Sequence, residues 1–179
     1  AVVNLDNSAL WRVSKFDFGN SVASLMVNNG ATVDMTFDDT AATELAITDY
    51  SGTGGNFIMD TDLAAETGDK VNITNAAAGT TYIQVKDASL INGHMVTGAK
   101  NLLLITDASQ NVNFVGKNLN AGGLWDVTPT LENGENVTLT DGSQGTKDQW
   151  YLTKIAKAVN NDSQVLLDAV DSSYASVSY

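Results

Sequence analysis

The chain contains no cysteine, one proline, one histidine and one arginine. The lack of cysteine excludes disulfides, thiolate metal sites and thiol catalysis. It also suits a protein that crosses membranes unfolded, since a premature disulfide would block the passage. His94, in "LINGHMVTG", has no serine or aspartate arranged around it for a catalytic triad, so we interpret it as a loop residue. Arg12 alone cannot form a paired guanidinium clamp. These absences predict no catalytic residue, no cofactor and no resident metal.

Positive charge and long apolar runs are scarce as well. Nine lysine and arginine residues stand against 21 acids, which gives a formal net charge of -12 and argues against nucleic acid as a partner. No apolar run is long enough to predict a membrane-spanning helix. The opening "AVVNLDNSALW" has neither the basic nor the apolar region of a signal peptide. Since it also lacks an initial methionine, we expect the sequence to be a part of a longer chain.

What the chain does have is short runs in which apolar and polar residues alternate. They include "DKVNITN", "TTYIQVKD", "NVNFVG" and, later, "GLWDVTPTLE" and "DQWYLTKI". "SLMVNNGATVDMTF" contains two such runs around a tight turn at Asn28-Asn29-Gly30. Its second run places Val33, Met35 and Phe37 on one inward face. A period of two over most of the chain predicts an all-β protein.

The shortness of these strands favours one all-β architecture. A β-sandwich would have fewer and longer strands, whereas Asn, Asp, Gly and Thr crowd the gaps here. This texture is typical of a parallel β-helix, in which coils stack ~4.8 Å apart, polar residues form ladders at the corners, and Val, Ile, Leu and Phe fill the interior. We find no motif that repeats at a fixed period.

Three regions follow from this pattern. We expect β-helix coils over residues 1–116 and a hairpin cap over 117–155, with turns at "NAGG", "ENGE" and "DGSQGTKD". Residues 156–179 would be a linker that starts a short helix, with Asp162 or Ser163 as its N-cap. The apolar residues at helical spacing there are Val165, Leu166, Ala169 and Val170.

Aspartates and tryptophans are the remaining candidates for a site. The acidic runs "TFDDT", "DTDLAAETGD" and "DAVD" do not follow the calcium-loop spacing, so we interpret them as solvated turn residues rather than ion ligands. Trp11, Trp125 and Trp150 all lie in alternating strands with apolar neighbours. We therefore expect them to pack in the core or the cap rather than to stack on sugars.

Residues 57–87, "FIMDTDLAAETGDKVNITNAAAGTTYIQVKD", carry a family resemblance. A strand, an Asp62-Leu63-Ala64 turn, the pair Gly68-Asp69 and two further apolar strands follow one another as in the C-terminal passenger region of pertactin- and AIDA-like Gram-negative autotransporters, the proteins of type V secretion. "LLLITDASQNVNFVGKNLNAGGLWDVTPTLE" and "DQWYLT" are similar to the closing hairpins of that family. The tail "LLDAVDSSYASVSY" resembles the segment that leads into its translocator barrel.

The resemblance implies a right-handed parallel β-helix whose cap is an autochaperone that folds first and templates the other coils. The implied family-motif turn is Asp62, Leu63, Gly68 and Asp69, and the implied folding nucleus is Trp125, Trp150, Tyr151 and Leu152. The implied partners are upstream coils, an outer-membrane β-barrel, and a ligand on a host cell or bacterial surface bound by the full passenger. The protein would be non-enzymatic and displayed outside the cell, with a role in adhesion or virulence. Some relatives are cleaved between paired asparagines, here Asn160 and Asn161, but the surrounding cleavage motif is not matched.

Two alternatives stay open at this point. One is a β-helical protein that binds or cleaves polysaccharide, for which a cluster of outward acids with a basic residue, or a groove of exposed aromatic rings, would be the sign. The other is self-association of the chain through an exposed strand edge.

Overall fold

The computed structural model describes residues 1–14, 20–37, 42–91, 96, 98–121 and 123–160. The described part is mostly β-strand, with a one-turn helix α1 (Ala88–Ile91) and a 3-10 turn at Gly134–Asn136. None of the helices in this part is long and apolar enough to cross a membrane.

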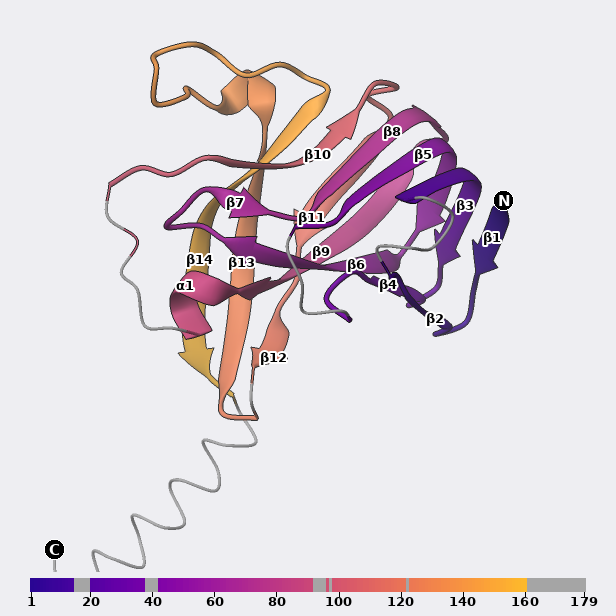
Figure 1. Ribbon diagram of the computed structural model, residues 1–179, viewed down its shortest axis with the longest axis horizontal. Coiled ribbons are helices and arrows are strands. Elements are labelled where there is room, and N and C mark those ends of the chain that lie inside the picture. Colours follow the sequence, from indigo (N-terminus) through magenta and orange to yellow (C-terminus); the bar gives the residue numbers. More distant parts are fainter. Residues whose placement is uncertain (15–19, 38–41, 92–95, 97, 122, 161–179) are drawn as a thin grey trace, which may run out of the picture.

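Apart from the short strand β7 (Thr67–Gly68), which forms a hairpin with β6, strands β1 to β11 wind into coils that give one strand to each of two parallel sheets (Figure 1). The first sheet takes its coil strands in the order β1-β3-β5-β8-β10, and the second in the order β2-β4-β6-β9-β11. The first set is β1 (Val2–Leu5), β3 (Ser21–Asn28), β5 (Glu44–Thr53), β8 (Lys70–Ala76) and β10 (Leu102–Asp107). The second set is β2 (Leu10–Arg12), β4 (Thr32–Asp34), β6 (Gly55–Asp62), β9 (Gly79–Asp87) and β11 (Val112–Gly116). Such a winding is a parallel β-helix, as the sequence predicts.

The register stacks similar side chains from coil to coil inside the solenoid. Val22, Ile47 and Ile73 are aligned across β3, β5 and β8. In the second sheet, Trp11, Val33, Phe57 and Ile83 form a similar ladder. Apart from the half-buried Trp11, these ladder residues are at most 3% exposed, because alternation turns every second residue away from water.

One aromatic side chain joins the two sheets across this interior. Tyr50 in β5 is buried, and its hydroxyl forms a 2.7 Å hydrogen bond with the hydroxyl of Thr81 in β9. Its ring lies 6.0 Å from that of Phe57. Burial raises the pKa of Tyr50 far above its ordinary value, so the phenol stays protonated and its bond to Thr81 persists.

The corners between the sheets are held by polar residues of neighbouring coils. The turn predicted at Asn28-Asn29-Gly30 is present, with Asn29 and Gly30 at φ 52° and 77°. It is a corner rather than a hairpin, since β3 and β4 lie in different sheets. The Asn28 side chain accepts from the Thr53 N–H at 2.9 Å, and Asn111 donates to the Ala76 carbonyl at 2.8 Å. Such bonds fix one coil to the next, as expected of corner ladders.

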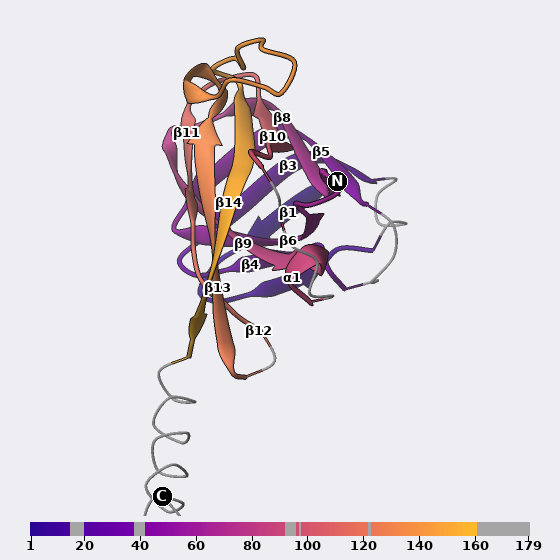
Figure 2. The same ribbon diagram turned by 90° about the vertical axis from the view of Figure 1, so that its left-hand side faces the viewer.

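The far end of the solenoid is closed by antiparallel strands. β12 (Leu119–Ala121), β13 (Trp125–Asn133) and β14 (Gln149–Val159) extend the first sheet in the order β10-β14-β13-β12. Figure 2 looks onto this cap, with the coils behind it. The sequence predicts the cap to end at residue 155, whereas β14 continues to Val159 into the predicted linker. The predicted helix after Asp162 lies outside the described residues.

One predicted inward residue is not inward. Val33 and Met35 are buried, but Phe37 is 55% exposed, because β4 ends at Asp34 and the alternation no longer applies beyond it. The guanidinium of Arg12 lies 5.4 Å from the centre of the Phe37 ring, which gives this exposed side chain a partner on the surface.

Candidate functional site: the hairpin cap

The cap joins the coils through an antiparallel pairing of β14 with β10. Leu102 pairs with Leu152, and Ile105 pairs with Trp150. An irregularity in the register between Leu103 and Ile105 accompanies the burial of both Leu104 and Ile105. β14 thereby satisfies the backbone edge that β10 would otherwise expose at the end of the sheet.

Three of the residues implied as a folding nucleus lie at this junction. Leu152 is fully buried and belongs to the hydrophobic core of the coils, and Tyr151 is 5% exposed. Trp150 is half-buried and packs on the same core, with its ring centre 5.7 Å from that of Phe114 in an edge-to-face arrangement. Since Phe114 belongs to the last strand of the second sheet, this contact links the cap to both sheets.

The fourth residue implied for the nucleus is not part of the junction. Trp125 begins β13 at the opposite end of the hairpin and is 37% exposed. The Lys157 ammonium lies 4.2 Å from its ring centre. Trp125 does not pack in the core, because β13 extends beyond the last coil at this end. Its ring packs within the cap instead, against the Lys157 side chain of β14. Trp11, in contrast, packs against the core at half burial.

The second strand of the cap also approaches the coils closely. β13 carries Val127, buried at 5% exposure, into the core. A Cβ atom added to Gly116 would come within 1.9 Å of the Pro129 carbonyl oxygen. Only glycine leaves room for this approach between the last coil and the cap.

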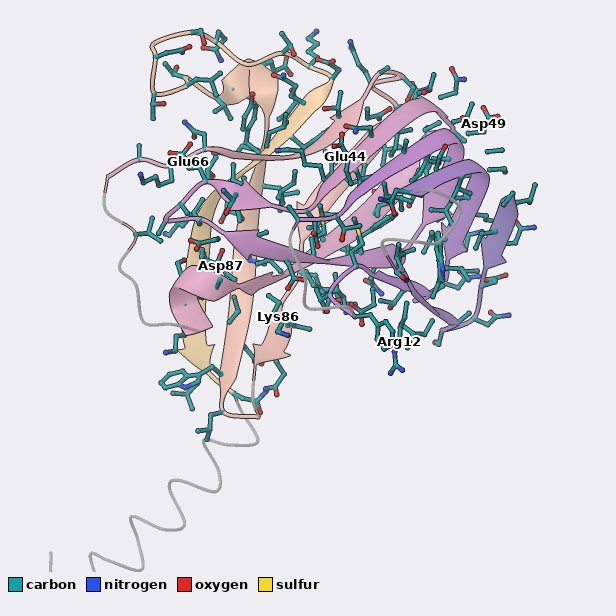
Figure 3. All side chains as sticks on the ribbon, viewed as in Figure 1. Arg12, Glu44, Asp49, Glu66, Lys86 and Asp87 are labelled. Atoms are coloured by element: carbon teal, nitrogen blue, oxygen red, sulfur yellow. The ribbon has the colours of Figure 1, made fainter. Side chains whose placement is uncertain are left out.

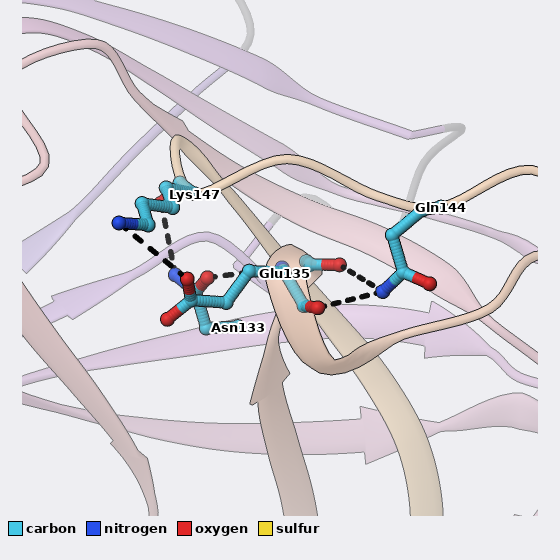
Figure 4. A network of polar contacts seen from close by, with 5 residues as sticks. Asn133, Glu135, Gln144 and Lys147 are labelled. Carbon is cyan, nitrogen blue, oxygen red and sulfur yellow. Dashed lines mark hydrogen bonds and ion pairs between the residues drawn. The ribbon is translucent and has the colours of Figure 1, made fainter.

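A polar loop connects β13 to β14 at the end of the hairpin opposite Trp125 (Figure 4). Asn133 donates from its side chain to the Lys147 carbonyl at 2.9 Å and accepts from the Glu135 N–H at 3.1 Å. Gln144 donates to the Glu135 carbonyl at 2.6 Å. The ion pair of Lys147 with Glu135, at 3.7 Å, is exposed and adds little. These bonds fix the loop, in which one apolar side chain, Val137, is buried at 3% exposure.

The family-motif turn lies where β6 meets the short strand β7 (Thr67–Gly68). Leu63 is buried, and Asp62 accepts from the Ala65 N–H at 3.0 Å. Gly68 pairs with Thr61, which closes the β6–β7 hairpin. The carboxylate of Asp69 accepts from the Thr43 N–H at 2.7 Å and from the Asp60 N–H at 2.8 Å. Asp69 therefore ties the turn to the start of the preceding coil.

Asp69 corrects the interpretation of the acidic run "DTDLAAETGD" as wholly solvated. It is 1% exposed, because the two N–H groups that it accepts from belong to backbone that covers it. Burial raises the pKa of Asp69 above the ordinary value of 3.8, and the bonds from Thr43 and Asp60 oppose this increase only in part.

This raised pKa predicts the pH dependence of stability at one position. The folded protein binds the Asp69 proton more tightly than the unfolded chain, so stability falls as pH rises from about 3.8 through the raised pKa, and is level above it. We expect the free energy of unfolding of the wild type, minus that of Asp69→Asn, to fall over this window. Denaturant unfolding at several pH values between about 3.5 and 7 measures it. A difference that grows with pH would mean that the native state favours the carboxylate.

Two further buried carboxylates were not singled out from the sequence. Asp87, at the end of β9 beside α1 in Figure 3, accepts from the Leu63 N–H at 3.0 Å and from the Thr61 hydroxyl at 2.6 Å. Its other oxygen accepts from the Ser89 N–H at 3.0 Å and from the Ser89 hydroxyl. Asp107 ends β10 and accepts from the Ser109 N–H at 3.0 Å and from the Val112 N–H at 3.1 Å. The repeated tripeptide Asp-Ala-Ser is the signal that could have identified both.

Several candidate residues of the sequence lie outside the described residues. These are His94, the two aspartates of "TFDDT", the segment "DAVD" and Asn161. Asn160 is described, and it donates from its side chain to Asp126 at 2.9 Å and from its N–H to the Leu124 carbonyl at 2.8 Å. Within residues 1–160, apart from the gaps in the description, no three His, Cys, Asp or Glu side chains come together as metal ligands.

The fold and the cap together define a class of protein: a parallel β-helix whose open end is closed by an antiparallel hairpin. A family model described as Pertactin matches residues 22–154, from the second described coil into β14. Because the match covers more than half of the chain, the protein belongs to the Pertactin family and is a passenger region of autotransporter type. Membership implies secretion through the outer membrane and exposure at the surface. A search of curated proteins finds no match to the chain.

Proposed function

We propose that this chain is the non-enzymatic, C-terminal part of an autotransporter passenger, and that its hairpin cap is an autochaperone that nucleates folding of the β-helix. The observation that carries the proposal is the junction of β14 with β10, which combines an edge-to-edge strand pairing with the buried side chain of Leu152. The cap supplies both the hydrogen-bonding edge and the apolar cover that an isolated coil lacks.

The order of folding follows from where the contacts lie in the sequence. β13 and β14 pair with each other over nearly their whole length, from Trp125–Val159 to Asn133–Trp150, and this pairing needs no coil. Each coil strand, in contrast, needs a neighbouring coil to pair with, and its interior stays open until that neighbour is present. A hairpin that forms first presents the free edge of β14 to β10, and stacking then proceeds toward β1.

Such a direction of growth suits export of the C-terminal end first. If coils fold on the outside as they emerge, folding opposes backward sliding of the chain, and no source of energy is needed outside the cell. We propose that the full passenger acts at the cell surface in adhesion or virulence. Its partners would be upstream coils, the membrane-embedded translocator and a host-cell or bacterial-surface ligand. This role rests on the family rather than on a binding site in the described residues.

A pair of truncations tests the nucleating role. We expect the chain that ends at residue 116, which lacks the cap, to be unfolded or aggregated. The matched control begins at residue 42, which removes the first coils but keeps the cap, and it is expected to show a cooperative β transition in denaturant by far-UV circular dichroism. If residues 1–116 alone fold as cooperatively as the full chain, the cap is an accessory and the proposal fails.

A further inference from the structure

The turn between β12 and β13 presents two adjacent exposed apolar side chains. Other large apolar side chains of the described residues are exposed as well: Val2, Leu10, Phe37 and Val115. Leu124 is 47% exposed and Trp125 is 37% exposed. Together with Lys157, whose ammonium lies over the Trp125 ring, they form what we call the hairpin tip. Figures 1 and 2 both place this turn beyond the coils, at the opposite end of the hairpin from the polar loop that joins β13 to β14.

The pleat of β13 explains why this surface is apolar. Trp125 lies on the same side of the strand as Val127, which enters the core. Trp125 pairs with Val159, and Val127 pairs with Lys157, so this side of the three-stranded cap is a continuation of its core-facing side past the last coil. Nothing in the described coils reaches far enough to cover it, and the Lys157 side chain lies across the ring instead.

The hairpin tip also differs from the rest of the molecule in charge. The chain as a whole carries a formal charge of -12. Asp126, next to Trp125 in the chain, lies on the other side of β13, and its carboxylate accepts from Asn120 at 3.3 Å and from Asn160 at 2.9 Å. On the tip side lies the Lys157 ammonium, 4.2 Å from the centre of the Trp125 ring. The tip therefore combines leucine, tryptophan and a cation in an acidic protein.

The chain also leaves the cap at this place. The Asn160 N–H donates to the Leu124 carbonyl at 2.8 Å, so the end of β14 is joined to the turn itself. Residues 161–179 continue from there. If the chain runs on toward the membrane, as the proposed function requires, the hairpin tip is the part of the cap that meets the bilayer surface first.

We infer that the hairpin tip docks on the outer bilayer surface, with Leu124 and Trp125 in the headgroup layer and the Lys157 ammonium on lipid phosphate oxygens. This inference rests on the proposed function. Indole rings prefer the boundary between headgroups and acyl chains, and a lysine beside them extends its ammonium to the polar side. Two such side chains bind weakly alone, but attachment of the following chain to the membrane raises their effective concentration at the surface.

The experiment uses the full chain and vesicles of phosphatidylcholine brominated in the acyl chains. Bromine quenches only tryptophans that reach the headgroup boundary, so we expect quenching at millimolar lipid and none with bromine-free vesicles. Leu124→Asp keeps Trp125 as the reporter and is expected to lower the lipid partition coefficient about tenfold or more. The matched control is Val2→Asp, which changes a side chain 68% exposed in β1 at the other end of the solenoid and is expected to leave quenching unchanged.

Three outcomes would overturn the inference. The first is an absence of quenching in the wild type, and the second is an equal loss of quenching in Leu124→Asp and Val2→Asp. The third is self-association in lipid-free solution that Leu124→Asp abolishes, because the tip would then be a contact between two copies of the chain. Circular dichroism must show both variants folded. The truncation experiment involves no lipid, so the two proposals can fail separately. If the vesicles do not quench tryptophan fluorescence, the nucleating role of the cap is unaffected. If residues 1–116 fold without the cap, a positive quenching result still shows binding to lipid.

Discussion

Replacing Trp150 by alanine is expected to lower the free energy of unfolding by about 3 kcal/mol, at the low end of the range for buried aromatic residues because the ring is only half-buried. The substitution removes the edge-to-face contact with Phe114 and opens the core beside Leu152. If the junction is largely formed in the transition state, refolding should also slow roughly 30-fold. Stopped-flow fluorescence, with unfolding in denaturant, measures both quantities.

Trp125→Ala is the matched control for this substitution. It removes the same side chain from the same hairpin, but from its exposed end. We expect a loss of stability below about 1 kcal/mol and an unchanged refolding rate. A Trp150 variant that unfolds faster but refolds at the wild-type rate would place the β10–β14 junction after the transition state, and the cap would then not be the nucleus.

Replacing Asp87 by alanine is the second substitution for which we expect a large effect. The carboxylate accepts from N–H groups of Leu63 and Ser89, which lie on two neighbouring turns. Without it these buried donors remain unpaired, at about 1–3 kcal/mol each, so we expect a loss of roughly 3 kcal/mol or more. Because Leu63 belongs to the family-motif turn, thermal unfolding should begin at lower temperature, with increased protease cleavage near residues 62–68.

The matched control is the same local motif at the surface. Asp141 accepts from the Ser143 N–H at 2.9 Å and from its hydroxyl at 2.6 Å, much as Asp87 accepts from Ser89, but Asp141 is exposed. Asp141→Ala should leave the unfolding midpoint unchanged, since water replaces the lost acceptor. An equal loss of stability at both positions would mean that the motif stabilises only its local turn, and that burial of the Asp87 carboxylate adds nothing to stability.

The strands could be predicted from the sequence because their signal is local. Alternation at Val71 and Ile73, or at Ile83 and Val85, needs only a few neighbouring residues to be recognised, and all four side chains are buried as expected. The hairpin cap was predictable for the same reason, since each of its turns, such as "ENGE" and "DGSQGTKD", is recognised from a few neighbouring residues. Where a strand ends could not be predicted, as Phe37 and the extension of β14 to Val159 show.

The burial of individual polar groups depends on contacts that are distant in the sequence. In the sequence, Asp69 cannot be distinguished from a solvated turn residue. It is buried because backbone of the preceding coil covers it, and the Thr43 N–H of that coil donates to its carboxylate. Asp87 is buried because Thr61 and Leu63 come to lie beside it. Conversely, Trp125 has apolar neighbours in the sequence, as a core residue would. It is partly exposed because the last coil ends before it reaches this part of β13, which only the tertiary structure shows.

The sequence by itself thus determined the all-β class and the parallel β-helix with its hairpin cap, because period-two alternation and turn residues are recognised within one coil. The family followed separately, from the resemblance carried by residues 57–87. The tertiary structure decided which charged groups are buried, which tryptophan joins the cap to the core, and which one projects at the hairpin tip. These depend on the register of one coil on the next, and the stacking of coils sets that register through contacts about 25 residues apart.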